Sequence, residues 1–395
     1  MKSRWSAFLV GLTAQIVFSA TFLGLPTASI LFQGALHLDV SELAVFLGSA
    51  SIAVVVTEAP WGMAADRFGE RRVLLAGIGI TVLALTGLGI ASSLSVTPPL
   101  WVLASLLFVA AGAGGAVTGP SGSAVLGWFD ARRHATLVTL RVASVPVGGA
   151  LGTVAYAILL EALGVVGTFI VAAAACALVG ALVALLSFDP PRGHDSDGPP
   201  SGVLSDPRVW RVAITGFLLD VSQFLVLTFA ATALHQLFSV PVAVGLAWVT
   251  VMQLLGGALR VLAGVGTDLL PWLSRARVVR GLGLVQVMCL APFLCGALLP
   301  VHLAIALMVI AGIAGCAWQG AHFSHMAILA GPGGAGAALG LNNTATSLGA
   351  FTAQVIAGTC VVAFDWPVTV LLLGALPAFL ASLLFPGDSA ENAPR

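Results

Sequence analysis

Apolar runs of about 20 residues recur along the whole chain, and they limit its fold more than any other feature. A helix of that length is needed to cross the hydrocarbon of a bilayer. Of the 395 residues, 59% are hydrophobic and only 8% are charged, which is too little polar surface for a soluble protein. The net charge is zero, which gives no electrostatic argument for a nucleic-acid partner. The sequence predicts an all-α membrane protein.

The predicted helices number twelve. Their approximate bounds are 6–32, 42–64, 72–93, 100–122, 135–160, 164–187, 209–237, 241–265, 278–299, 302–328, 334–362 and 366–385. The clearly polar stretch rich in Pro and Gly is FDPPRGHDSDGPPSGVLSDP, residues 188–207. We therefore predict two six-helix bundles, 1–187 and 208–395, joined by this cytoplasmic linker.

The lysines and arginines predict the topology. Fourteen of the 16 lie at the termini or in short loops: Lys2, Arg4, Arg67, Arg71, Arg72, Arg132, Arg133, Arg192, Arg208, Arg211, Arg275, Arg277, Arg280 and Arg395. The loops among these follow spans 2, 4, 6 and 8, while the loops after spans 1, 3, 5, 7, 9 and 11, and also the loop after span 10, have no basic residue. The positive-inside rule then places both termini in the cytoplasm of a bacterial-type inner membrane.

The two halves carry similar loops at matching places. Residues 62–72 read GMAADRFGERR after the second span, and residues 264–268 read GVGTD after the eighth. Asp66 and Asp268 are 202 residues apart, about half the chain. Two repeated halves with the substrate held between them near mid-membrane are a recurring plan of transporters.

Residues 62–72 resemble the cytoplasmic loop motif of the major facilitator superfamily, Gly-x-Leu-Ala-Asp-Arg-x-Gly-Arg-Arg. Glu70 departs from that motif, which more often has a basic residue there. The resemblance implies two pseudo-symmetric bundles that rock about a central site, with spans 3, 6, 9 and 12 on the outside. It also implies a latch on the cytoplasmic side, formed by Gly62, Asp66, Arg67, Arg71, Arg72 and Asp268. The alternative is that the two aspartates only cap or brace their loops.

Four charged side chains stand inside predicted spans: Glu58 in span 2, Arg141 in span 5, Asp220 in span 7 and Arg260 in span 8. Each is eight or nine residues from a polar loop residue, so each lies about 12–14 Å from the cytoplasmic edge. All four belong to spans that the resemblance places around the cavity. Charge in hydrocarbon is costly, which makes these residues candidates for function.

The arginines predict an anionic substrate. In the superfamily, spans 5 and 8 neighbour each other, so Arg141 and Arg260 are expected to converge. Two guanidinium groups repel each other unless an anion lies between them, and each has the planar fork that suits a carboxylate. The alternative is two internal ion pairs, Arg260–Asp220 and Arg141–Glu58. Further candidate substrate contacts are Asn343, which the repeat relates to Arg141, and Gln253, Trp318 and Gln319.

Asp220 and Glu58 are the candidate proton carriers. Burial favours the neutral form of a carboxyl group and a nearby arginine favours the ionised form, so a group near that balance can load and release a proton. The alternative for each carboxylate is that it is a fixed ion-pair partner of an arginine and carries no proton. His322 and His325, three residues apart on one helix face, are either a proton route or packing residues. Gln15 and Gln223 contact either substrate or a neighbouring helix.

Two features bear on the branch of the superfamily. Residues 127–133 (GWFDARR) and the arginine in span 8 are similar to monocarboxylate transporters and oxalate–formate exchangers. The acidic-Gly-aromatic element of the first span and the Asp of span 8 that mark the monocarboxylate transporters are missing. Proton-driven drug exporters are the alternative, but their arginine in span 4 is missing, and Val145–Gly149 (VPVGG) differs from their Gly-Pro-x-x-Gly-Gly element.

The sequence therefore predicts a secondary transporter of a small organic anion, coupled to protons. No enzyme constellation, phosphate-binding loop or metal-ligand spacing is visible. We accordingly expect no cofactor and no metal, and a monomer whose partners are the anion, protons and the lipid bilayer.

Overall fold

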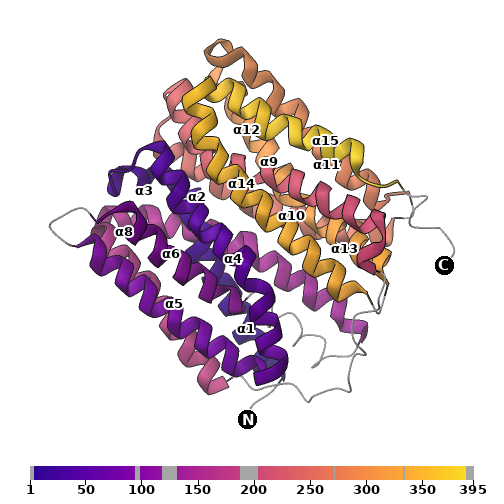
Figure 1. Cartoon of the computed structure of the whole chain (residues 1–395). Helices are drawn as coiled ribbons and strands as arrows, with labels where there is room; N and C mark the ends of the chain where they lie inside the picture. Colours follow the sequence, from indigo (N-terminus) through magenta and orange to yellow (C-terminus); the bar gives the residue numbers. More distant parts are fainter. Residues whose placement is uncertain are drawn as a thin grey trace. The chain divides into compact units, whose positions relative to one another are not determined.

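The computed structural model describes residues 4–93, 98–117, 131–186, 203–270, 272–331 and 334–387, and every element in these ranges is a helix (Figure 1). The chain divides into two compact units, Met1–His194 and Asp195–Arg395. Most of the predicted linker, the end of the fourth predicted span and residues 127–130 lie outside the described ranges.

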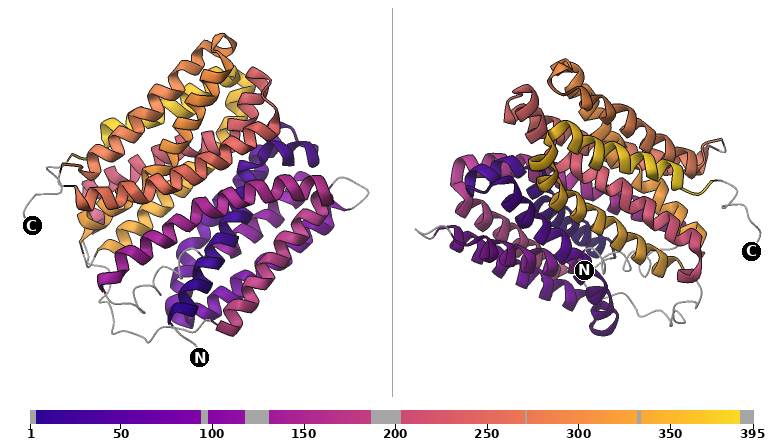
Figure 2. Two further views of the ribbon diagram at one scale, coloured as in Figure 1. Left: turned by 180° about the vertical axis from the view of Figure 1, so that it is seen from behind. Right: turned by 45° about the horizontal axis from the view of Figure 1, so that its top comes forward.

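The first unit contains seven described helices and a short 3-10 turn. They are α1 (Arg4–Phe22), α2 (Gly24–Thr27), α3 (Ser29–Ala35), α4 (Val40–Phe68), α5 (Glu70–Ser92), α6 (Leu100–Gly114), η1 (Gly115–Val117) and α8 (Ala131–Leu186). Its core is built from leucine, phenylalanine, valine and alanine side chains of these helices. Figure 2 shows the same helices from two further sides.

The second unit contains the remaining elements. They are η2 (Val203–Ser205), α9 (Pro207–Phe238), α10 (Val242–Leu269), α11 (Arg275–Leu290), η3 (Ala291–Leu298), α12 (Val301–Ala317), α13 (Gln319–Ala330), α14 (Ala335–Thr369), η4 (Val370–Ala375) and α15 (Leu376–Leu384). α9 is the most buried of the candidate membrane spans, with 78% of its apolar window inside the protein. It therefore forms the centre of this unit.

Ten described helical stretches are long and apolar enough to cross a membrane, and two of them are long enough to cross it twice. Residues 143–186 are interrupted at Gly164 (φ 63°), and residues 337–384 at Asp365 (φ 64°). Both residues combine a positive φ with an extended ψ, which interrupts the helix; glycine adopts this conformation freely, whereas it is strained for Asp365. Twelve crossings result within the described residues, which confirms the predicted fold.

Small residues allow α1 and α2 to pack closely against α8. A Cβ atom on Gly152 would overlap the backbone of Ala20, and one on Gly24 would lie 2.6 Å from the Cα of Gly152. Such contacts between small residues are a general means of packing helices in lipid, where no hydrophobic effect drives helices together. They fix the orientation of the part of α8 that carries Arg141.

An arginine fastens the third crossing to the sixth in each unit. Arg71, in the first turn of α5, donates from Nη2 to the carbonyl oxygen of Ala184 near the end of α8, at 2.6 Å. Arg280, in the second turn of α11, donates from Nη2 to the carbonyl oxygen of Phe385 after α15, also at 2.6 Å. Carbonyls at a helix C-terminus lack intrahelical partners and carry the negative end of the helix dipole, so cations there are favourable.

Asp206 caps α9 from the preceding loop. Its carboxylate accepts a hydrogen bond from the Arg208 backbone N–H and lies 2.8 Å from the Arg208 guanidinium. The hydrogen bond from the Arg208 side chain lowers the pKa of the Asp206 carboxyl below its ordinary value.

We expect Asp206→Ala to reduce the free energy of unfolding by about 1 kcal/mol, as loss of an N-cap usually does. Because the pKa is lowered in the folded state, this contribution is present above the ordinary pKa of an aspartate and is lost as the pH falls through the lowered value. Thermal unfolding of both proteins in detergent, at neutral and at acidic pH, measures the effect. An equal difference between the two proteins at both pH values would contradict it.

Candidate functional site

A hydrogen-bonded polar cluster lies in the second unit, where α9 faces the junction of α12 and α13. The Gln319 side-chain amide donates to Oδ1 of Asp220 at 3.2 Å and to Oε1 of Gln223 at 3.4 Å. The indole N–H of Trp318 donates to the same Oε1 of Gln223 at 3.0 Å. Asp220 and Gln223 are three residues apart, so they share one face of α9. The structure thus brings together Asp220, Trp318 and Gln319, three of the predicted site residues.

Arg260 reaches this cluster from α10. Its Nε donates to the carbonyl oxygen of Cys316 at 2.7 Å, in the last turn of α12, where helix carbonyls lack intrahelical partners. Gly320 makes this approach possible, because a Cβ atom there would lie 2.6 Å from the Arg260 carbonyl oxygen. Arg260 and Asp220 are close enough to interact electrostatically.

The alternative of a direct Arg260–Asp220 ion pair is wrong for this structure. Within the described residues, Nε of Arg260 bonds to Cys316 and the Asp220 carboxylate accepts from Gln319, with no ion pair between the two charges. The break between α12 and α13 supplies the backbone acceptor that holds Arg260 in this position.

Three side chains of the cluster are more than nine-tenths buried and yet have unused hydrogen-bonding groups. Asp220 is 3% exposed, and Gln223 and Arg260 are each 4% exposed. Within the described part of the chain, neither terminal nitrogen of Arg260, nor Oδ2 of Asp220, nor Nε2 of Gln223 has a hydrogen-bond partner. We refer to Asp220, Gln223, Arg260, Trp318 and Gln319 as the polar cluster.

The first unit holds a second group of charges. Arg141, on α8, is half-buried, and its Nη2 lies 3.5 Å from Oε1 of Gln15 on α1. Glu70 and Glu58 both act on it electrostatically. Glu58, predicted as a proton carrier, is thus near Arg141, as the sequence suggested. Glu70 was not predicted to be there, and its departure from the loop motif was the signal that could have revealed it.

Two further predicted contacts lie on the helices of the second unit. Gln253 is fully buried on α10, two turns before Arg260. Asn343 is half-buried on α14, while its neighbour Asn342 is fully buried with neither amide atom bonded to a described residue. The internal repeat pointed to Asn343, but it did not distinguish this residue from its neighbour Asn342.

The predicted gate residues are described in part. Arg71 bonds within its own unit, Arg67 lies over the Phe68 ring at 5.3 Å, and Arg72 is exposed. Gly62 has open space where a Cβ atom would lie, as has its repeat partner Gly264. The side chains of Asp66 and Asp268 lie outside the described residues.

His322 and His325 are both buried on α13. Nε2 of His322 lies 3.0 Å from the Val212 carbonyl oxygen and 3.3 Å from the Thr215 hydroxyl, both on α9. Both rings pack against Phe385. These contacts favour the packing alternative for His322, and no group that could hold a metal ion occurs among the described residues.

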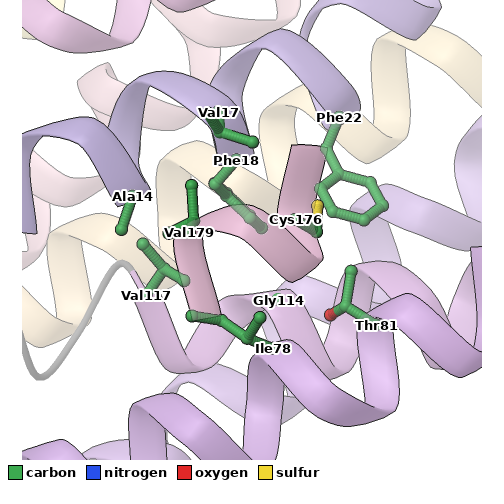
Figure 3. Close-up of a pocket in the computed structure, with 10 residues that line it drawn as sticks. All are labelled: Ala14, Val17, Phe18, Phe22, Ile78, Thr81, Gly114, Val117, Cys176 and Val179. Carbon is green, nitrogen blue, oxygen red and sulfur yellow. The ribbon is translucent and has the colours of Figure 1, made fainter. Parts of the chain in front are cut away.

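A small cavity in the first unit is apolar (Figure 3). It is lined by Ala14, Val17, Phe18, Phe22, Ile78, Thr81, Gly114, Val117, Cys176 and Val179. The Thr81 hydroxyl already donates to the Ala110 carbonyl oxygen. None of these lining residues is charged, so this cavity has no group that would attract an anion.

Comparison with known proteins settles the family. Residues 7–354 match the family described as the Major Facilitator Superfamily. The chain belongs to this superfamily. It is therefore a multi-pass membrane protein and a secondary transporter, not an enzyme.

Relatives and solved structures agree with this assignment. An uncharacterized MFS-type transporter of Mycobacterium tuberculosis is 28% identical over 388 residues, covering 95% of this chain and 83% of that protein. A crystal structure of the nucleoside transporter NupG has a TM-score of 0.74 at 14% identity, covering 97% of this chain and 98% of that one. A bacterial homologue of the human lysosomal transporter Spinster, inward-facing and unoccupied, has a TM-score of 0.75 at 16% identity and covers 99% of both chains. These structural likenesses show the fold alone.

Proposed function

We propose that this transporter carries a small organic anion, a carboxylate, together with a proton, by alternating access. The observation that carries the proposal is the Arg260 guanidinium, which is buried, is held by Cys316 and has terminal nitrogens without a hydrogen-bond partner among the described residues. A guanidinium fork binds a carboxylate with two parallel hydrogen bonds. Because Nε is already bonded to the backbone, the terminal nitrogens are the donors left for a substrate.

Asp220 is the proposed proton carrier. One of its oxygens is held by Gln319, and the other has no partner among the described residues. Protonation of Asp220 removes a negative charge beside Arg260, which then favours an incoming anion. Release of the proton restores the competition between the Asp220 carboxylate and the substrate for the same arginine. This competition couples the two movements. Glu58, near Arg141, is the second candidate carrier.

Further substrate contacts are assigned to both units. We assign them to Arg141, Asn343, Gln253, Trp318 and Gln319. For the gate, we assign Gly62, Asp66, Arg67, Arg71, Arg72 and Asp268 to a cytoplasmic latch, with both termini on the cytoplasmic side. Arg71 has in addition the bond to Ala184 within its own unit.

A ligand screen tests the substrate class. Purified protein in detergent is heated with small carboxylates, amino acids or cationic drugs, and the shift in unfolding temperature is measured. A carboxylate at one hundred times its Kd should stabilise the protein by about 2.7 kcal/mol, while cationic drugs should give no shift.

In a second experiment, transport is measured in liposomes loaded with the carboxylate that stabilises the protein most. Saturable counterflow of labelled carboxylate, driven further by a pH gradient, is the expected result. Stabilisation and transport of cationic drugs alone would instead favour the proton-driven exporter.

A further inference from the structure

We propose that Arg211 and Arg280, at the end of α15, bind the phosphate headgroup of an anionic phospholipid. The site lies in the second unit, and none of its residues belongs to the polar cluster. Because it concerns the bilayer around the transporter, the proposal does not depend on which substrate the protein carries. Under the proposed topology, this end of the unit faces the cytoplasmic leaflet.

Two arginines from different helices meet at the end of α15. Nη2 of Arg211, on α9, donates to the carbonyl oxygen of Leu384 at 2.9 Å. Nη2 of Arg280, on α11, donates to the carbonyl oxygen of Phe385 at 2.6 Å. Leu384 and Phe385 are neighbours in the chain, so their Cα atoms are about 3.8 Å apart. The two hydrogen bonds therefore hold two positive charges beside each other at one helix end.

These two charges are not balanced by any described carboxylate. Neither Arg211 nor Arg280 forms an ion pair within the described ranges. Nε of Arg280 is buried and has no hydrogen-bond partner there. Two cations held together repel each other, and an anion placed between them turns that repulsion into attraction. The planar guanidinium fork suits the oxygens of a phosphate group.

The first unit shows that one arginine is enough to hold such a helix end. There Arg71 donates to the Ala184 carbonyl oxygen, and the Leu186 carbonyl oxygen accepts a hydrogen bond from the Ser6 hydroxyl at 3.4 Å. The second unit has the charged Arg211 where the first unit has this neutral hydroxyl. The connection between the third and sixth crossings therefore does not require the charge of Arg211, which is available for another role.

The surroundings favour a lipid over a dissolved phosphate. α11 is the least buried of the ten candidate membrane spans, with 28% of its apolar window inside the protein. About one turn deeper than the arginines, Ile214 and Leu284 are exposed on the same helix faces as Arg211 and Arg280. Trp210 is exposed beside Arg211, as is typical of the membrane interface. Charge at the helix ends and apolar side chains below it match a phospholipid headgroup and its acyl chains.

The excess of positive charge discriminates between phospholipids. Phosphatidylglycerol has a phosphate and a neutral glycerol, whereas phosphatidylcholine adds a quaternary ammonium that two arginines repel. A basic residue near the membrane surface strengthens the binding of anionic lipid by about fivefold in Kd. We therefore expect purified, delipidated protein to bind phosphatidylglycerol about fivefold or more tightly than phosphatidylcholine, measured as Kd by native mass spectrometry.

Single variants assign this preference to the two arginines. Arg211→Gln and Arg280→Gln each remove one charge and should each weaken phosphatidylglycerol binding about fivefold, with phosphatidylcholine binding unchanged. Arg211→Lys keeps the charge and should keep most of the affinity, which a purely structural role of the guanidinium would not predict. Arg208→Gln is the matched control, because Arg208 lies on the same helix, is exposed and pairs with Asp206. It should bind like the wild type.

Two results on lipid binding would overturn the site. The first is equal affinity of wild-type protein for the two lipids, or an unchanged affinity for phosphatidylglycerol in both Gln variants. The second is binding of glycerol 3-phosphate as tight as that of phosphatidylglycerol, which would indicate a site for a soluble phosphate. Should Arg280→Gln not fold, Arg211→Gln and Arg211→Lys decide, because Arg211 is exposed.

The carboxylate of Asp388 is the rival occupant. Asp388 follows Gly387 in the sequence, and a Cβ atom on Gly387 would lie 3.7 Å from Nη2 of Arg280. If phosphatidylglycerol bound to Asp388→Asn but not to the wild type, the arginines would be occupied by the chain's own carboxylate and the lipid site would be wrong. Equal binding by Asp388→Asn and the wild type is the expected result.

Discussion

Replacing Arg260 with alanine is expected to abolish the binding of organic anions while leaving the purified protein folded. Removing one partner of a buried, hydrogen-bonded charge pair costs about 2–5 kcal/mol, which is about 30-fold to several thousand-fold in Kd. The fold should persist because, among the described residues, the side chain makes one hydrogen bond, to the Cys316 carbonyl oxygen. Calorimetric titration of the best carboxylate, with unfolding temperature as the check on folding, measures both effects.

Two further variants make the result specific to Arg260. Arg260→Lys keeps the charge but lacks the planar fork and the Nε that bonds to Cys316, so it should recover only a small part of the affinity. Arg208→Ala removes an exposed arginine that pairs with Asp206, outside the polar cluster, and should bind like the wild type. Unchanged affinity in Arg260→Ala would remove Arg260 from the site and with it the main support for an anionic substrate.

The variant Asp220→Asn is expected to exchange substrate at close to the wild-type rate and to lose accumulation driven by a pH gradient. Asparagine has nearly the shape of aspartate and can still accept the hydrogen bond from Gln319, but it cannot take up or release a proton. The neutral side chain resembles the protonated, anion-binding state of the carrier. Counterflow in liposomes measures exchange, and uptake under an imposed pH gradient measures coupling.

Asp365→Asn is the matched control for this substitution. Asp365 is exposed between the last two crossings, and asparagine has nearly the same shape, so the substitution leaves the backbone strain there about the same. This variant should keep both exchange and accumulation. If Asp220→Asn followed the wild-type pH dependence, the proton would have to be carried by another group, and Glu58 would be the next to test.

The crossings and the buried charges were predictable from the sequence because both depend on composition along one helix. A charge in an apolar run of the right length is inside the membrane whatever its neighbours are. Apart from the nearness of Glu58 to Arg141, the partners of these charges were not predictable. An ion pair between Arg260 and Asp220 was one alternative from the sequence, but the hydrogen-bond partner of Arg260 is a backbone carbonyl, which is available because α12 ends at Ala317.

The contacts of two further residues, Gln223 and Glu70, could not be predicted from the sequence either. Gln223 could be recognised as an intramembrane amide, but its fixed orientation depends on Trp318, 95 residues away, being turned toward it. Glu70 stood out as a departure from a loop motif, while its proximity to Arg141 depends on the packing of α5 against α8. Such contacts depend on how each helix is rotated about its axis and on where helices are interrupted. The pattern of hydrophobic residues along the chain predicts neither.

The arginines that fasten the third crossing to the sixth have a mechanical consequence. Arg280 follows Arg71 by 209 residues, whereas the acceptor Phe385 follows Ala184 by 201, so the two halves make the same connection in different registers. In both units the hydrogen bond joins the first two turns of the third crossing to the C-terminal end of the sixth. Through this hydrogen bond, a displacement of one helix is transmitted to the other, so the two crossings of each unit are expected to move together.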